Sequence, residues 1–202
     1  MKKLTLLFFV FHFSFFTFKL CEAQVIHVPA DYPTIQQGID AATPGDTVLV
    51  ADGLYYEQIS FLGKKPLMVA SHYLMTGDTN HINNTILDGS QITDMDNASV
   101  VYFTSGEDTT CILCGFTVRG GKGTLNSGPN NRCGGGIFIS ESGAKIINNN
   151  ITANTLDDSQ PVNGQNVYGG GIGTKSEYGD YWIVIEHNHV YDNTAVTQYE
   201  TS

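Results

Sequence analysis

Basic residues are scarce in this sequence. Lysine and arginine together number 10 against 20 aspartate and glutamate residues, so the formal net charge is −10 at pH 7. A chain of this charge repels nucleic acid and anionic lipid surfaces, which makes both poor partners. The charge also disfavours direct contact with an acidic polysaccharide, unless a cation such as calcium bridges the two.

Apolar runs long enough to cross a membrane are lacking beyond the N-terminus. There, two lysines precede the apolar run Leu4–Phe18, and the small-x-small signal Cys21–Ala23 follows it. This order is typical of a secretory signal peptide, and the run is short for a membrane span. We predict a signal peptide over residues 1–23 with cleavage between Ala23 and Gln24. The mature chain is then expected to be secreted or held at the cell surface, without membrane insertion.

Cysteine is also rare, and only Cys111, Cys114 and Cys133 follow the predicted leader. A lone C-x-x-C pair without a second pair or a histidine cluster does not make a zinc site. Residues three apart on a strand also face opposite sides, which works against chelation. Two alternatives remain open: buried thiols in the core, or one disulfide that involves Cys133.

Internal repetition is the main feature that is present. The segment Gly134–Ile137 recurs as Gly169–Ile172, and Ile146–Asn154 recurs as Ile185–Asn193 with its aliphatic and asparagine positions largely kept. A unit of this size cannot bury its own apolar face, but units stacked in parallel can. We predict an all-β fold, a parallel β-helix (solenoid) over residues 24–202.

Stacking places equivalent side chains of successive repeats on top of one another. The aliphatic pairs are expected to share the core, and the asparagine pairs are expected to hydrogen-bond along the stack. These pairs are Ile146/Ile185, Ile151/Val190, Asn149/Asn188 and Asn154/Asn193. Short strands at this spacing are also compatible with an antiparallel sandwich, but the constant order of the repeat favours the parallel arrangement.

One segment has helical spacing. Ile35, Ile39 and Ala42 repeat on one helical face, Pro33 suits a first turn, and the following Pro-Gly pair ends the helix. We predict a helix over Pro33–Ala42. Since the end of a stack of parallel coils exposes unpaired strand edges, we expect this helix to cap the N-terminal end.

The opening of the predicted domain resembles a known superfamily. The runs Ile26–Gln36, Gly45–Val50 and Gly53–Glu57, with Thr85–Gly89 and Gly115–Val118, are similar to right-handed parallel β-helix proteins of the pectin lyase-like superfamily. The resemblance implies a right-handed coil and, if the protein is an enzyme, a polysaccharide lyase or another carbohydrate-active enzyme. It does not fix an activity, because these features build coils in members with different functions.

The pectin methylesterases of that superfamily can be tested residue by residue. Gly53, Tyr55 and Glu57 are similar to the first methylesterase signature, but the signatures that carry the catalytic carboxylates have no match. An esterase is therefore disfavoured. A packed tyrosine and a solvated or turn-capping glutamate explain Tyr55 and Glu57 better.

Candidate site residues fall into four groups. Arg119 and Lys122 flank the turn after a predicted strand. The resemblance to lyases implies a basic catalytic residue, for which these two are candidates, and solvated surface charge is the alternative. Tyr168, Tyr181 and Trp182 are candidate platforms for sugar rings, although core packing explains such aromatics equally well. The acidic pair Asp157/Asp158, like Asp94/Asp96 and Glu107/Asp108, has oxygen donors for calcium or is solvated loop charge. His187 and His189 lie two apart on a predicted strand and lack a third metal ligand.

Two functions follow from these observations. The first is a secreted β-helix protein that binds or processes an extracellular polysaccharide, with calcium as a possible cofactor. The second is a non-catalytic adhesion or structural β-helix protein of the cell surface. Because the last repeat ends near Asn193 and no covering unit follows, we expect the chain to continue beyond Ser202.

Overall fold

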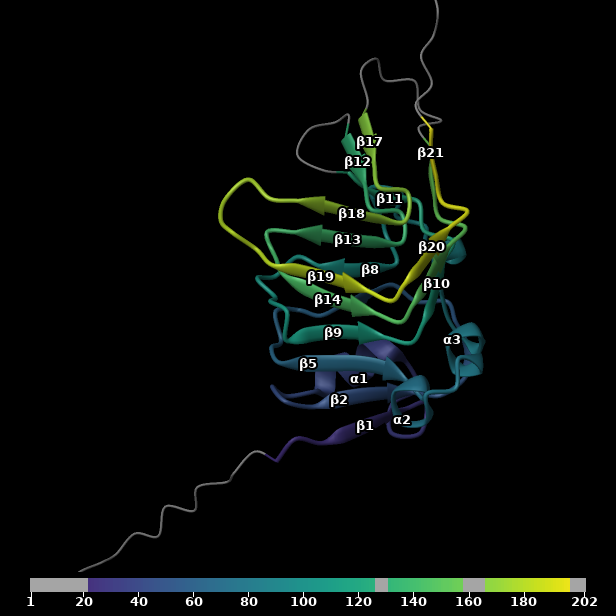
Figure 1. The fold of residues 1–202 in the computed structure, drawn as a ribbon, viewed down its shortest axis with the longest axis vertical. Coiled ribbons are helices and arrows are strands. Elements are labelled where there is room, and N and C mark those ends of the chain that lie inside the picture. Colours follow the sequence, from purple (N-terminus) through teal and green to yellow (C-terminus); the bar gives the residue numbers. More distant parts are fainter. Residues whose placement is uncertain (1–21, 126–130, 158–165, 197–202) are drawn as a thin grey trace, which may run out of the picture.

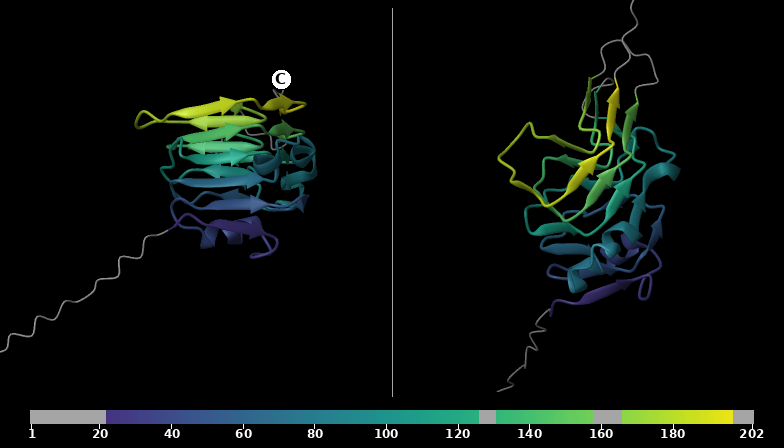
Figure 2. Two further views of the ribbon diagram at one scale, coloured as in Figure 1. Left: turned by 60° about the horizontal axis from the view of Figure 1, so that its bottom comes forward. Right: turned by 45° about the vertical axis from the view of Figure 1, so that its right-hand side comes forward.

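The computed structural model of this chain is a parallel β-solenoid, in which short strands of successive coils lie in register (Figure 1). It describes residues 22–125, 131–157 and 166–196. The further views in Figure 2 show the coils layered from the N-terminal to the C-terminal end. The predicted parallel β architecture is confirmed, and the antiparallel sandwich is wrong.

Two sheets form adjacent walls of the solenoid, and every strand pair in them is parallel. The six-stranded sheet contains β1 (Val25–Val28), β2 (Thr47–Val50), β5 (Leu67–Ser71), β9 (Cys111–Cys114), β14 (Ala144–Ile147) and β19 (Ile183–Glu186). The five-stranded sheet contains β3 (Gly53–Tyr55), β6 (Thr85–Asp88), β10 (Thr117–Arg119), β15 (Asn150–Thr152) and β20 (His189–Tyr191).

Three smaller sheets complete the coils. The next wall is parallel throughout and contains β4 (Ile59–Ser60), β8 (Val101–Phe103), β13 (Ile137–Ser140) and β18 (Ile172–Lys175). A mixed sheet, in which β11 runs antiparallel to both neighbours, contains β7 (Asn97–Ala98), β11 (Gly123–Leu125), β12 (Asn131–Cys133) and β17 (Asn166–Tyr168). The last pair is β16 (Thr155–Asp157) with β21 (Thr194–Val196).

The helices are short, and none in the described part of the chain is long and apolar enough to span a membrane. They are α1 (Ile35–Ala41), α2 (Tyr73–Thr76), α3 (Asn80–Asn84) and the 3₁₀ turn η1 (Gly89–Gln91). The predicted helix is present as α1, which packs against β1, β2 and β4 with Ile35 and Ile39 fully buried. The helix was predicted over Pro33–Ala42, but it begins two residues later, at Ile35. Thr34 is the N-cap, because its hydroxyl accepts from the Gln37 N–H.

The Gly53-Tyr55-Glu57 pattern has a structural role at this helix. The Glu57 carboxylate accepts hydrogen bonds from the backbone N–H groups of Ile35 and Gln36, both at 3.1 Å. These N–H groups lie in the first turn, where no carbonyl of the helix reaches them. Tyr55 packs against the core and donates its hydroxyl to the carbonyl of Ala51 at 2.9 Å. The preference for a structural role over an esterase signature agrees with these contacts.

The core fills the space between the walls with aliphatic and aromatic side chains. Phe61 and Phe103 stack with ring centroids 4.3 Å apart, and Ile146 and Ile151 are fully buried. The prediction of a shared core fails for Ile185 and Val190, which are 47% and 52% exposed. They lie in register with Ile146 and Ile151, but they belong to the last described coil, where no further coil covers them.

The predicted asparagine ladders are confirmed. The Asn149 amide donates to the Asn188 carboxamide oxygen at 3.1 Å, and Asn154 donates to Asn193 at 2.9 Å. Asn149 also accepts from the backbone N–H of Phe116, one coil earlier. Asparagine therefore satisfies backbone groups at bends that strand pairing does not reach.

The structure supports the first of the two alternatives for the cysteines, buried thiols in the core. Cys111, Cys114 and Cys133 are all free and buried, so the disulfide alternative is wrong for the described residues. Burial raises the pKa of all three thiols, and it raises the pKa of Cys133 to about 11. A thiol that stays protonated is a poor nucleophile and a poor metal ligand, so these side chains act as core residues.

Candidate functional site

The outward face of the five-stranded sheet carries two columns of stacked side chains. The first column lies toward the beginning of the strands and contains Leu54, Ile86, Thr117, Asn150 and His189, which are in register from strand to strand. The second column lies at or just beyond the strand ends and contains Tyr56, Asp88, Arg119, Thr152 and Tyr191. The residues between the columns, such as Val118 and Ile151, face inward and are buried. This alternation follows from the two-residue period of a strand.

A helical arm stands over the first column. It comprises α2 and α3, and α3 packs on β6 and β10 (Figure 1). The hydroxyl of Thr117 donates to the carbonyl of Ile82 at 2.8 Å, and the Asn150 amide donates to the Asn83 side chain at 2.9 Å. The arm therefore covers the first column at Thr117 and forms a wall beside the later coils.

A hydrogen-bonded histidine–aspartate pair fixes the arm to the body of the solenoid. His81 Nδ1 lies 2.6 Å from Asp52 Oδ1, and the rings of His81 and His72 meet edge to face with centroids 5.7 Å apart. Burial favours the neutral form of Asp52, but the hydrogen bond and charge of His81 outweigh it and lower the pKa of Asp52. Asp52 is therefore held as a carboxylate at neutral pH.

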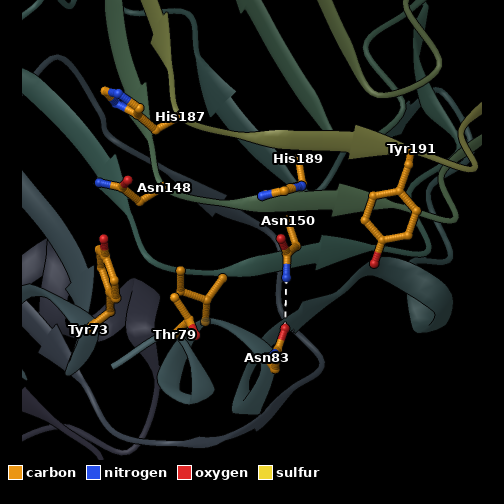
Figure 3. Close-up of a pocket in the computed structure, with 9 residues that line it drawn as sticks. Tyr73, Thr79, Asn83, Asn148, Asn150, His187, His189 and Tyr191 are labelled. Carbon is orange, nitrogen blue, oxygen red and sulfur yellow. Dashed lines mark hydrogen bonds between the residues drawn. The ribbon is translucent and has the colours of Figure 1, made fainter. Parts of the chain in front are cut away.

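A pocket of about 530 Å³ opens where the arm meets the last coils (Figure 3). From the arm come phenol, hydroxyl and amide groups, and from β15, β20 and the turns before them come amides, imidazoles and a second phenol. The residues that define this polar pocket are Tyr73, Asn83, Asn150, His187, His189 and Tyr191. Its groups can donate and accept hydrogen bonds, and the two tyrosines add flat apolar surface.

The two histidines reach the pocket by different routes. His189 lies in β20, directly above Asn150 of β15. The prediction that His187 shares that strand was wrong: it lies in the turn between β19 and β20, with the left-handed φ of 54°. Both still line the same pocket (Figure 3). Within the described residues, no three His, Cys, Asp or Glu side chains come close enough together to hold a metal ion.

A second, smaller pocket of about 270 Å³ lies at the other end of the second column. Its lining includes Tyr56, Glu57, Asp88, Gln91 and Asp94. Glu57 and Asp94 already cap local backbone, at α1 and at the turn to Asp96. This second pocket therefore presents hydroxyl, amide and carboxylate groups.

Arg119, a predicted catalytic candidate, lies between the two pockets. Its Nε donates to Asp88 Oδ2 at 2.7 Å, and the Asp88 side chain is only 6% exposed. Burial opposes ionisation of Asp88, but hydrogen bonds from Ser90 and Arg119 lower its pKa. Lys122, the other candidate, follows β10 in the turn toward β11, where its backbone N–H donates to Ala98. Of the two candidates, Arg119 is therefore the one whose side chain is held in an ion pair, with Asp88.

The aromatic candidates lie elsewhere. Tyr181 and Trp182 belong to the loop between β18 and β19, at the opposite end of β19 from the polar pocket (Figure 1). Trp182 is 80% exposed, and Tyr168 lies on β17 and is also exposed. None of these three aromatic residues, nor Arg119 or Lys122, lines the polar pocket or the second pocket.

The acidic candidates have different outcomes. Asp158 and the side chain of Asp157 lie outside the described residues. Glu107 is buried and accepts hydrogen bonds from the Gly63 and Ser105 N–H groups and from the Ser142 hydroxyl, each at 2.8 Å. Glu107 thus joins neighbouring coils as a structural acceptor.

Sequence reasoning did not identify most residues of the polar pocket. The repeat aligns His189 with Asn150 and so indicates a shared face, but no sequence signal connects either of them to Tyr73 or Asn83. The arm that carries the last two is an insertion between β5 and β6 without a counterpart in the repeats.

The fold and this outer face together define a parallel β-solenoid with a polar, tyrosine-bearing pocket on an outer wall. Comparison of the chain with profiles of known families, with curated proteins and with solved structures found no match.

Proposed function

We propose that this protein binds an extracellular polysaccharide in the polar pocket between the helical arm and strands β15 and β20. The observation that carries the proposal is the composition of the pocket wall: amides, imidazoles and hydroxyls beside the rings of Tyr73 and Tyr191. Sugars present hydroxyl groups around an apolar ring face, so they need convergent polar groups together with flat aromatic surface. The Asn83–Asn150 hydrogen bond holds two of the amides in fixed positions before a ligand arrives.

The proposal includes a right-handed coil of the pectin lyase-like kind, with α1 as its N-terminal cap. Support comes from the sequence resemblance and from the strong preference of parallel crossover connections for the right-handed form. The burial of Ile35 and Ile39 against the first coil supports the role of α1. The proposal also includes secretion, which the predicted signal peptide supports and which a protein with an extracellular ligand requires.

Secretion has a specific expected outcome at the N-terminus. The backbone nitrogen of Gln24 lies 2.8 Å from Asp46 Oδ1, so cleavage after Ala23 would place a new ammonium group beside that carboxylate. Burial favours neutral Asp46, but hydrogen bonds from Thr43 and Gln24 lower its pKa, so its charge is available for pairing. Peptide mapping of protein exported by a secreting host should find a first peptide that begins at Gln24. A first peptide that begins at Met1 would contradict secretion by cleavage here.

Binding in the polar pocket can be tested with the double variant His189→Ala/Tyr191→Ala. Both side chains are exposed and end in the pocket, so the fold should tolerate their removal. Loss of an aromatic contact and of hydrogen bonds should weaken binding at least about tenfold, which corresponds to about 1.4 kcal/mol. The measurement is titration calorimetry with a polysaccharide that the wild-type protein selects from a broad glycan panel.

The matched control is Tyr178→Ala, which removes a tyrosine that is 76% exposed in the loop before β19. It should leave binding unchanged. Equal binding by the double variant and the wild type would place the site elsewhere, and a loss confined to Tyr178→Ala would place it in the aromatic loop. A folded, secreted protein that binds no glycan of the panel would overturn the proposal and favour an adhesive or structural role.

A further inference from the structure

The geometry points to a binding track longer than the polar pocket, and to an uncharged ligand. We infer that a linear, neutral glycan lies along the second column, parallel to the solenoid axis, from Tyr191 in the polar pocket to Tyr56 in the second pocket. This inference rests on the proposed function and extends it in two respects: the direction of the bound chain and its charge.

The direction follows from the register of the strands. Tyr191 is in register with Thr152, and Arg119 is in register with Asp88. Thr152 and Arg119 are neighbours in the column because each directly follows one residue of the register pair Ile151 and Val118. Tyr56 likewise follows Tyr55, whose partner Leu87 precedes Asp88. Neighbouring strands lie about 4.8 Å apart, so these four steps span about 19 Å. A column of this length offers contacts to several sugars of one extended chain.

The two ends of the column are alike. Tyr191 is 48% exposed and Tyr56 is 49% exposed, and each lines one of the two pockets. A single patch would need only one pocket. Two concave sites with a tyrosine in each, joined by one straight column, match a ligand that repeats along its length.

The helical arm gives the track a side wall. It covers the first column at Thr117, whose hydroxyl is bonded to the arm and which is buried. The second column beside it is exposed at Tyr56, Arg119 and Tyr191, while the Asp88 side chain lies beneath the surface, 6% exposed and paired with Arg119. A ligand is thereby directed along the axis instead of across the sheet.

The charges on the track favour a neutral glycan. In the described residues, neither pocket is lined by lysine or arginine, and Glu57, Asp88 and Asp94 line the second pocket. Asp88 balances the charge of Arg119. A uronate chain would bring its carboxylates toward these groups on a protein of net charge −10, whereas sugar hydroxyls can donate hydrogen bonds to them.

The test compares Tyr56→Ala with Tyr191→Ala on neutral oligosaccharides of graded length. The probes are glucan, mannan, xylan and galactan oligomers of two to eight sugars, with oligogalacturonates of the same lengths as charged counterparts. Tyr191→Ala should weaken the binding of short and long oligomers alike, while Tyr56→Ala should weaken only the long ones, about tenfold. Tyr178→Ala serves again as the control.

Each result has a separate meaning. If Tyr191→Ala weakens binding but Tyr56→Ala leaves the longest oligomer unaffected, the track is overturned and the pocket proposal stands. If Tyr56→Ala weakens short and long oligomers alike, the second pocket is a separate site and the axial track is wrong. Tighter binding of oligogalacturonate than of every neutral oligomer overturns the neutral class. If no oligomer binds, the proposed function itself fails.

Discussion

Replacing Gly121 by alanine is expected to prevent the coils from stacking. A Cβ at this position would overlap the carbonyl oxygen of Gly135 in the next coil, and a Cβ at Gly135 would likewise overlap the carbonyl of Gly170. Gly135 lies between β12 and β13, and Gly170 lies between β17 and β18. Paired strands therefore hold the backbone before and after each of these oxygens, and this backbone cannot move away as a flexible side chain would. Overpacking of this kind costs about 3 kcal/mol or more where the neighbours cannot relax. Urea unfolding followed by circular dichroism should show a large loss of stability or no folded protein.

Gly77→Ala is the matched control for this prediction. A Cβ at Gly77 would meet no atom within 4 Å, although its φ of +70° is unfavourable for alanine. The strain of one left-handed alanine is about 1–2 kcal/mol, so this variant should fold. If Gly121→Ala is as stable as Gly77→Ala, the close contact between the coils is not present in solution.

The sequence was informative where the fold repeats itself. Gly135 and Gly170 stand at the same repeat position, as do Asn149 and Asn188, and the solenoid stacks them in space. A residue in a solenoid contacts its own equivalent one coil away, so a pattern along the chain becomes a contact between coils. That is why the parallel stack and its asparagine ladders could be predicted.

The candidate site could be predicted only in small part. Arg119 remains a predicted catalytic candidate; it lies in the second column, and its partner Asp88 was not predicted. Tyr73 and Asn83 come from the arm, which interrupts the repeat once and lacks a periodic signal. Its contacts with β15 depend on the Asp52–His81 pair and on the way α3 packs. Such contacts are long-range and occur once, so a single sequence does not reveal them.

Replacing Asn149 by alanine should be the most damaging change in the asparagine ladders. The side chain is 1% exposed; it accepts from the Phe116 N–H at 2.9 Å and donates to the Leu113 carbonyl at 3.1 Å. Alanine would leave both backbone groups buried without these partners, and each such group costs about 1–3 kcal/mol. The free energy of unfolding should therefore fall by about 3 kcal/mol or more, measured by urea unfolding of the secreted protein.

The chain provides its own control, because Asn188 is the equivalent residue one coil later. Its amide donates to the Ile146 carbonyl at 2.7 Å, but it is only partly buried, so water can replace the lost contacts. Asn188→Ala should then cost about 1 kcal/mol. The difference between the two variants measures how much of the ladder's contribution depends on exclusion of water by the coils above and below. Equal losses for both would mean that Asn149 is hydrated in solution and that the coils around it are not closed.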